Sequence, residues 1–117
     1  VPLHCTASGK LFLAQMPKKE RDALIDRLPL ARMTANTLVK ADALRTECDA
    51  IAKRGYSRDC EEFIAGLVAV AVPVRDAAGQ VRAALAVHAP TARMSMEEAV
   101  KRIDALKAAA ERMGTLV

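Results

Sequence analysis

The chain has 117 residues, of which 52% are hydrophobic, 3% aromatic and 27% charged, and its formal net charge is +4. This length allows one domain with a sizeable core. No apolar run is long enough to span a membrane. The basic side chains are mixed with acids and lack neighbouring aromatics, which argues against a nucleic-acid surface on this chain.

The cysteines and histidines argue against a disulfide framework and against a metal site. Cys5, Cys48 and Cys60 are odd in number and show no CxxC spacing, which favours free thiols in a reducing cytoplasm. His4 and His88 lie far apart and offer no close pair of metal ligands. The N-terminus has no basic segment followed by an apolar one, so nothing indicates export. We expect a cytoplasmic protein without metal or cofactor.

Three helices are predicted in the first half of the chain. The first runs through residues 10–15, with Thr6 or Ser8 as its cap, and the second lies between Pro17 and Pro29. A third starts at about residue 40, where apolar residues repeat at helical spacing. Gly55 is placed to end it in the left-handed conformation.

Two strands are predicted next, over residues 63–74 and 81–89, joined by a loop of hairpin composition. Alternation gives this hairpin one bulky aliphatic face and one face of alanines, with Leu67 and His88 at its ends. Small side chains on a covered face leave volume for a small ligand. The same face could instead be filled by the last helix, because alanine permits close packing.

The last predicted helix starts at a capping box formed by Ser95 and Glu98 and ends at Gly114. Its predicted buried stripe consists of Val100, Ile103, Leu106, Ala110 and Met113. The fold class predicted from this order of elements is α/β (α+β), an antiparallel sheet flanked by helices in one domain, residues 1–117.

The segment from Gly55 to Asp76 carries the most specific pattern. A glycine is followed four residues on by an aspartate and three further on by a glutamate, then by a small–aliphatic–small triplet. The matching positions are Gly55, Asp59, Glu62, Ala69, Val70, Ala71, Val74 and Asp76. Together with the PLHCTASGK segment at residues 2–10, this pattern resembles the IclR family of bacterial transcriptional regulators. Arg75 alone departs from it, and we expect its side chain to point to solvent.

The resemblance implies a GAF/profilin-like effector domain, of which residues 1–117 would be the C-terminal part. The winged helix-turn-helix that binds DNA in this family is absent from this chain. The family's effector pocket, carried over residue by residue, would consist of Ala7, Ser8, Asp59, Leu67, Ala69, Ala86 and His88. The effector would be a small carboxylate, held by helix N-terminal amides and the Ser8 hydroxyl, with Asp59 sharing a proton or accepting a hydrogen bond. Family members regulate transcription as repressors or activators and assemble as homodimers or homotetramers.

Simpler interpretations stand beside this one. Ser8 could be a helix cap, Asp59 a solvated turn acid together with Glu61 and Glu62, and His88 a surface residue. The chain could also be an oligomerisation module without a ligand. An enzyme that pairs Cys5 or Cys60 with His4 or His88 is a further alternative, but no third orienting group is identifiable. We expect no enzymatic activity.

Overall fold

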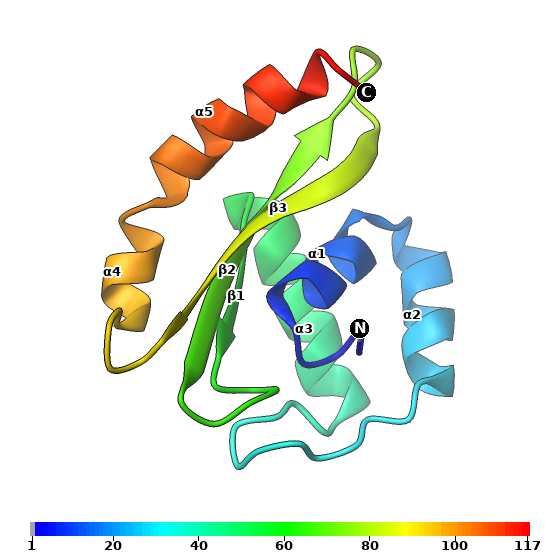
Figure 1. Ribbon diagram of the computed structural model, residues 1–117. Coiled ribbons are helices and arrows are strands. Elements are labelled where there is room, and N and C mark those ends of the chain that lie inside the picture. Colours follow the sequence, from blue (N-terminus) through cyan, green and yellow to red (C-terminus); the bar gives the residue numbers. More distant parts are fainter. Residues whose placement is uncertain (1) are drawn as a thin grey trace.

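The computed structural model describes residues 2–117, which form a three-stranded antiparallel sheet between two layers of helices (Figure 1). The elements are α1 (Ala7–Gln15), α2 (Lys18–Arg27), α3 (Ala41–Arg54), β1 (Ser57–Cys60), β2 (Leu67–Arg75), β3 (Val81–Pro90), α4 (Met96–Val100) and α5 (Ile103–Gly114). The helices α1, α2 and α3 lie on one side of the sheet, and α4 and α5 lie on the other (Figure 1). The predicted α+β fold class is confirmed.

The first helix begins where its side-chain cap requires. Thr6 is the residue before α1, and its Oγ1 accepts a hydrogen bond from the backbone N–H of Gly9 at 2.9 Å. Thr6 is therefore the cap, and the interpretation of Ser8 as a cap is wrong. Helix α3 ends at Gly55, whose φ of 84° is the predicted left-handed conformation.

The prediction of the first strand is wrong at the N-terminal end of the strand. It begins at Leu67 rather than at residue 63, and residues 61–66 form a loop. The short strand β1 precedes that loop and pairs antiparallel with β2, so the sheet order is β1-β2-β3. Sequence reasoning missed β1 because its residues Ser57–Cys60 are mostly polar and have low strand propensity.

The hairpin has the two predicted faces, one aliphatic and one of alanines, and different helices cover them. Val70 and Val72 are fully buried in a cluster with residues of α4 and α5. Ala69 and Ala71 are equally buried on the opposite face, in a cluster with residues of α1 and α3. The alanine face is therefore covered by α1, against which α3 packs, and the alternative in which the last helix fills it is wrong.

The predicted last helix is divided in two. The capping box at its start is present, since Oγ of Ser95 accepts a hydrogen bond from the N–H of Glu98 at 3.1 Å. A turn at residues 101–102 then separates α4 from α5. Met113, predicted to be buried, is 40% exposed.

None of the helices described within residues 2–117 has the length and apolar composition of a membrane span.

Candidate functional site

Asp59, Ala69 and His88 form one line across the three strands. Asp59 of β1 pairs with Ala69 of β2, and Ala69 pairs with His88 of β3. Residues directly opposite one another in antiparallel strands point to the same face. Three residues predicted for the effector site are thus brought together on the alanine face, beside α1.

The other predicted residues lie around this line. Ala7 begins α1 and is buried in the same cluster as Ala69, and Ala86 is partly buried against that cluster. Ala86 pairs with Ala71, the next position along the same face. Leu67 is partly buried at the start of β2, opposite Pro90.

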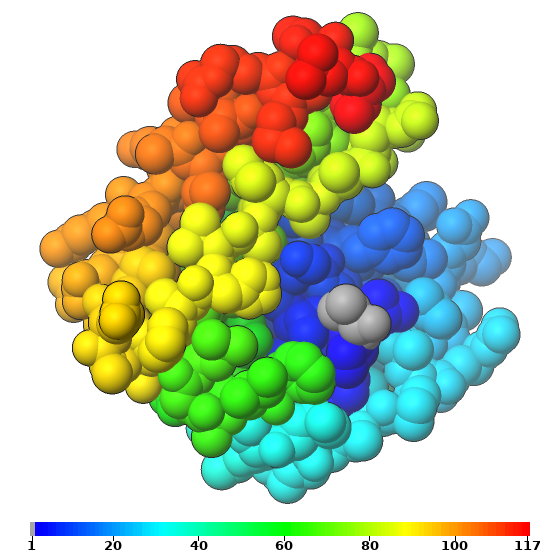
Figure 2. Space-filling model, in the orientation of Figure 1, coloured from blue at the N-terminus to red at the C-terminus, as the bar shows by residue number. Residues whose placement is uncertain are grey.

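Of the residues predicted for the effector site, Ser8 lies apart from the line of Asp59, Ala69 and His88. It lines a small hollow of about 90 Å³ together with Phe12 and residues 81–84, at the other end of β3 from His88. The structure therefore does not place the Ser8 side chain in one cavity with Asp59. Figure 2 shows the blue surface of the N-terminal segment and α1 between the yellow of β3 and the green and cyan loops.

The N-terminus of α1 can still receive an anion through its backbone. The first N–H groups of a helix have no acceptor within the helix. Because the Thr6 side chain accepts from Gly9, the amides of Ala7 and Ser8 are the ones left without an intrahelical partner. The helix dipole favours negative charge at this end.

Asp59 is the central titratable group of the site. Its side chain is 2% exposed, and Oδ1 accepts a hydrogen bond from the backbone N–H of Glu62 at 2.7 Å. Burial raises the pKa of this carboxyl, and the charge of Glu62 adds to the rise. The hydrogen bond from the N–H of Glu62 and the charge of Lys10 oppose it, with a smaller contribution from His88. The interpretation of Asp59 as a solvated turn acid is therefore wrong.

A buried ion pair next to Asp59 was not predicted. Nζ of Lys10 lies 2.7 Å from Oε1 of Glu62, and Lys10 is 1% exposed. The same Nζ donates to the backbone oxygen of Arg58 at 2.6 Å, while Oε2 of Glu62 accepts from the N–H of Cys60 at 3.1 Å. Glu62 is therefore not the solvated acid expected from the sequence. The lysine of the TASGK segment and the glutamate of the signature were the available signals, but no spacing rule joins residues 52 positions apart.

Polar side chains of residues 34–37 hold the loop that follows β1. Asn36 Nδ2 donates to the oxygen of Cys60 at 3.0 Å, Thr34 Oγ1 to that of Glu61 at 2.5 Å, and Thr37 Oγ1 to that of Glu62 at 2.7 Å. Glu61 is the one non-glycine residue within residues 2–117 with a positive φ, 57°. Three consecutive carbonyls are thus fixed around a turn that the backbone does not favour by itself.

Cys5 and Cys48 are poorly suited to act as nucleophiles. All three cysteines are free thiols, as predicted. Burial raises the pKa of Cys5, with the charges of Asp59 and Glu62 adding to the effect, and burial raises the pKa of Cys48 to about 11. His4 Nε2 lies 2.8 Å from the backbone oxygen of Ala31. A thiol that resists ionisation beside two carboxylates is a poor nucleophile.

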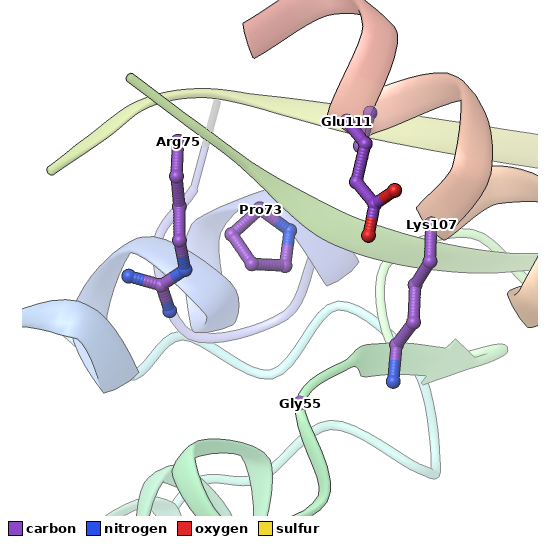
Figure 3. A pocket seen from close by; sticks show the side chains of 6 residues that line it. Gly55, Pro73, Arg75, Lys107 and Glu111 are labelled. Atoms are coloured by element: carbon purple, nitrogen blue, oxygen red, sulfur yellow. The ribbon is translucent and has the colours of Figure 1, made fainter. Parts of the chain in front are cut away.

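A second hollow lies away from these residues, between α5 and the edge of β2. It has a volume of about 400 Å³ and is lined by Gly55, Pro73, Arg75, Lys107, Ala110 and Glu111. Figure 3 shows Lys107 and Glu111 projecting from α5, with Arg75 on β2 beyond Pro73.

Arg75 of this hollow is held by hydrogen bonds, and Lys107 lies near the end of a helix. Lys107 Nζ lies beside Gly55, at the C-terminal end of α3, where a cation is favourable. Arg75 is exposed, as expected, and donates to Gln15 Oε1 and to the oxygen of Gly79, both at 3.0 Å. We therefore assign this hollow no ligand.

The sequence profile of the family described as bacterial transcriptional regulator IclR, C-terminal, matches residues 1–115. Among curated proteins, the probable transcriptional regulator SauR of Cupriavidus necator is 42% identical over 113 residues, which are 97% of this chain and 45% of the relative. KdgR of Escherichia coli, a transcriptional regulator, is 35% identical over 96% of this chain and 43% of its own length.

Solved structures agree with the sequence comparison. The inducer-binding domain of PobR from Acinetobacter, a double mutant in complex with 3-hydroxybenzoic acid, has a TM-score of 0.94 at 28% identity, and the match covers all of this chain and 67% of that one. The C-terminal domain of Escherichia coli KdgR has a TM-score of 0.85 at 35% identity, over 97% of this chain and 72% of that one. The chain thus spans less than half the length of the two curated relatives. It belongs to the IclR family of bacterial transcriptional regulators, a family of regulators rather than enzymes, and corresponds to the family's C-terminal domain.

Proposed function

We propose that this chain senses a small carboxylic acid for a transcriptional regulator, using the face around Asp59, Ala69 and His88. The observation that supports this most is the burial of Asp59 in line with Ala69 and His88, on the face of the sheet that α1 covers. A buried carboxyl with a raised pKa at such a place is more typical of a functional group than of a structural one. The proposed site comprises Ala7, Ser8, Asp59, Leu67, Ala69, Ala86 and His88.

The chemistry of the site suits a carboxylate in two ways. The amides of Ala7 and Ser8, which have no partner within the helix, donate to one ligand oxygen, and the helix dipole favours its charge. Asp59, whose pKa is raised, holds a proton more readily than an exposed aspartate and shares it with the second ligand oxygen. The PobR inducer-binding domain forms a complex with an aromatic carboxylic acid, 3-hydroxybenzoic acid, which supports the same ligand class for this chain.

The proposed mechanism is linkage between the effector and DNA. Ligand binding favours one arrangement of the domains, which changes operator affinity through a DNA-binding part outside these 117 residues. The regulator would act in the cytoplasm as a homodimer or homotetramer, as a repressor or an activator. Light scattering on the chain measures its own contribution to assembly.

A thermal-shift screen tests the ligand class. Benzoate, 3-hydroxybenzoate and short aliphatic carboxylates are compared with their amides, which have similar shape and no charge. A ligand of the native state raises the apparent stability by about 2.7 kcal/mol at a concentration one hundred times its dissociation constant. We expect a carboxylate to raise the melting temperature and its amide to leave it unchanged. Equal shifts for acid and amide, or none for any acid, would contradict the proposal.

A further inference from the structure

The ion pair of Lys10 and Glu62 connects the two halves of the proposed site. Lys10 lies on α1, within one turn of the amides of Ala7 and Ser8. Glu62 lies in the loop after β1, and its N–H donates to Asp59 Oδ1. The distance of 2.7 Å between Lys10 Nζ and Glu62 Oε1 therefore ties the anion-binding end of α1 to the carboxyl of Asp59.

Lys10 binds the chain on both sides of Asp59. Its Nζ donates to the backbone oxygen of Arg58, the preceding residue, and to the side chain of Glu62, three residues after Asp59. Oε2 of Glu62 then accepts from the N–H of Cys60, the following residue. Three contacts thus fix residues 58, 60 and 62, and the direction of the Asp59 side chain follows from them.

Stability alone is a poor reason for this arrangement. Lys10 and the side chain of Glu62 are 1% and 11% exposed, and moving two charges out of water offsets much of their attraction. A well-packed apolar pair of the same volume is commonly as stable as a buried ion pair. What an apolar pair cannot do is hold two backbone groups, the oxygen of Arg58 and the N–H of Cys60, at fixed positions around Asp59.

We propose that Lys10 and Glu62 are positioning residues of the effector site, which hold Asp59 in place relative to the amide end of α1. This rests on the proposed function for its consequence in binding, but the positioning itself is measurable without a ligand. Neither residue is among those assigned to contact the effector. They act through Asp59.

The test is the double variant Lys10→Met with Glu62→Leu, which replaces the ion pair by apolar side chains of similar size. Hydrogen exchange of the residue 62 amide reports the hydrogen bond to Asp59. We expect this exchange to become at least tenfold faster in a chain that remains folded. Affinity for 3-hydroxybenzoate should fall at least tenfold in the same variant. The matched control is Arg54→Met with Glu47→Leu, which removes an ion pair of 2.8 Å on α3. It should change neither the exchange of the residue 62 amide nor the affinity for 3-hydroxybenzoate.

The outcomes separate the two proposals. Unchanged exchange at residue 62 in a stable double variant would overturn the positioning role, as would native affinity for 3-hydroxybenzoate. If the native chain binds no carboxylate, the proposed function fails, and the exchange measurement still decides the role of the pair. If the double variant does not fold, Glu62→Asp, which withdraws the carboxylate from Lys10 by one methylene, should show the faster exchange in a folded chain, and unchanged exchange there would overturn the proposal.

Discussion

Asp59 and His88 lie in register on either side of Ala69, one on the first strand and one on the third. Asp59 is 2% exposed, whereas His88 is exposed, so the line runs from the interior to the surface. Burial raises the pKa of Asp59, and the smallest of the opposing contributions comes from His88. The two side chains are thus electrostatically coupled across an alanine, the smallest side chain that still packs.

Removing the Asp59 carboxyl should weaken effector binding. Asp59→Ala removes a hydrogen bond to a charged ligand, which contributes about 1.5–3 kcal/mol. Calorimetry with 3-hydroxybenzoate measures the loss. Asp59→Asn is the matched control for the fold, because its side-chain oxygen can still accept from the N–H of Glu62. Native affinity in a folded Asp59→Ala chain would remove Asp59 from the site.

The free energy of unfolding should depend on pH through the ionisation of Asp59. Its folded pKa is raised above the ordinary value of 3.8, so the folded state holds this proton more tightly than the unfolded state. The stability that this contributes is complete below pH 3.8 and is lost as pH rises through the folded pKa.

Urea denaturation of the native sequence and of Asp59→Asn, at a series of pH values, isolates this contribution from those of the other acids. We expect the native sequence to lose stability relative to Asp59→Asn as pH rises. A relative gain over the same range would show that the folded pKa is lowered instead.

Ala69→Leu distinguishes a ligand pocket from a solid core on the alanine face. Ala69 is fully buried, in one cluster with residues of α1 and α3. The proposed site predicts that the larger side chain occupies the ligand's volume, so that binding of 3-hydroxybenzoate is lost while the fold stays stable. If this face is solid core, the extra methylenes cost about 1–3 kcal/mol instead, which chemical denaturation measures as a lower midpoint with an unchanged slope. That second result would contradict the proposed site.

Gly9 should tolerate no side chain. A Cβ at this position would lie 2.6 Å from the oxygen of Pro2 and 2.7 Å from Cα of Leu3, both backbone atoms. Gly9→Ala therefore has to displace the segment before α1, and overpacking of this kind costs about 1–3 kcal/mol. Ser8→Ala, one residue earlier and half-buried, should change stability by less. Equal stability of the two variants in thermal melts would disprove this explanation of the glycine.

Thr37 should stabilise the loop after β1. It is 5% exposed, its hydroxyl donates to the oxygen of Glu62, and it accepts from the N–H groups of Met33 and Thr34. Thr37→Val keeps the shape and leaves these buried groups without partners, at a cost of about 1–3 kcal/mol. Differential scanning calorimetry measures the loss, with Thr37→Ser as the variant that retains the hydroxyl. If Thr37→Val and Thr37→Ser melt together, the hydroxyl is not what holds the loop.

Local patterns predicted the elements whose cause is local. The caps at Ser95 and Gly55 depend on residues within one turn, and the faces of the hairpin follow from the two-residue period of a strand. The break between α4 and α5 was missed because the apolar stripe of Val100, Ile103 and Leu106 continues across it. Nothing in the composition of residues 101–102 indicates a turn.

The candidate site was predictable only in part, since much of it is made by distant segments. The alternation of residues predicted that Ala69 and His88 share a face. Asp59 joined them through the resemblance to a family, because strand β1 has no apolar pattern. The pair of Lys10 and Glu62 joins elements that meet only in the folded chain, so no window of sequence contains it.

Amide chemical-shift mapping of the 117-residue chain during titration with 3-hydroxybenzoate tests the central claim most directly. We predict that the amides of Ala7, Ser8, Ala69 and His88 shift together along one saturable curve. Amides around the hollow of Gly55 and Lys107 should stay in place. Shifts confined to that hollow, or no saturable shift at the four named amides, would contradict the claim that this face of the sheet binds a small carboxylate.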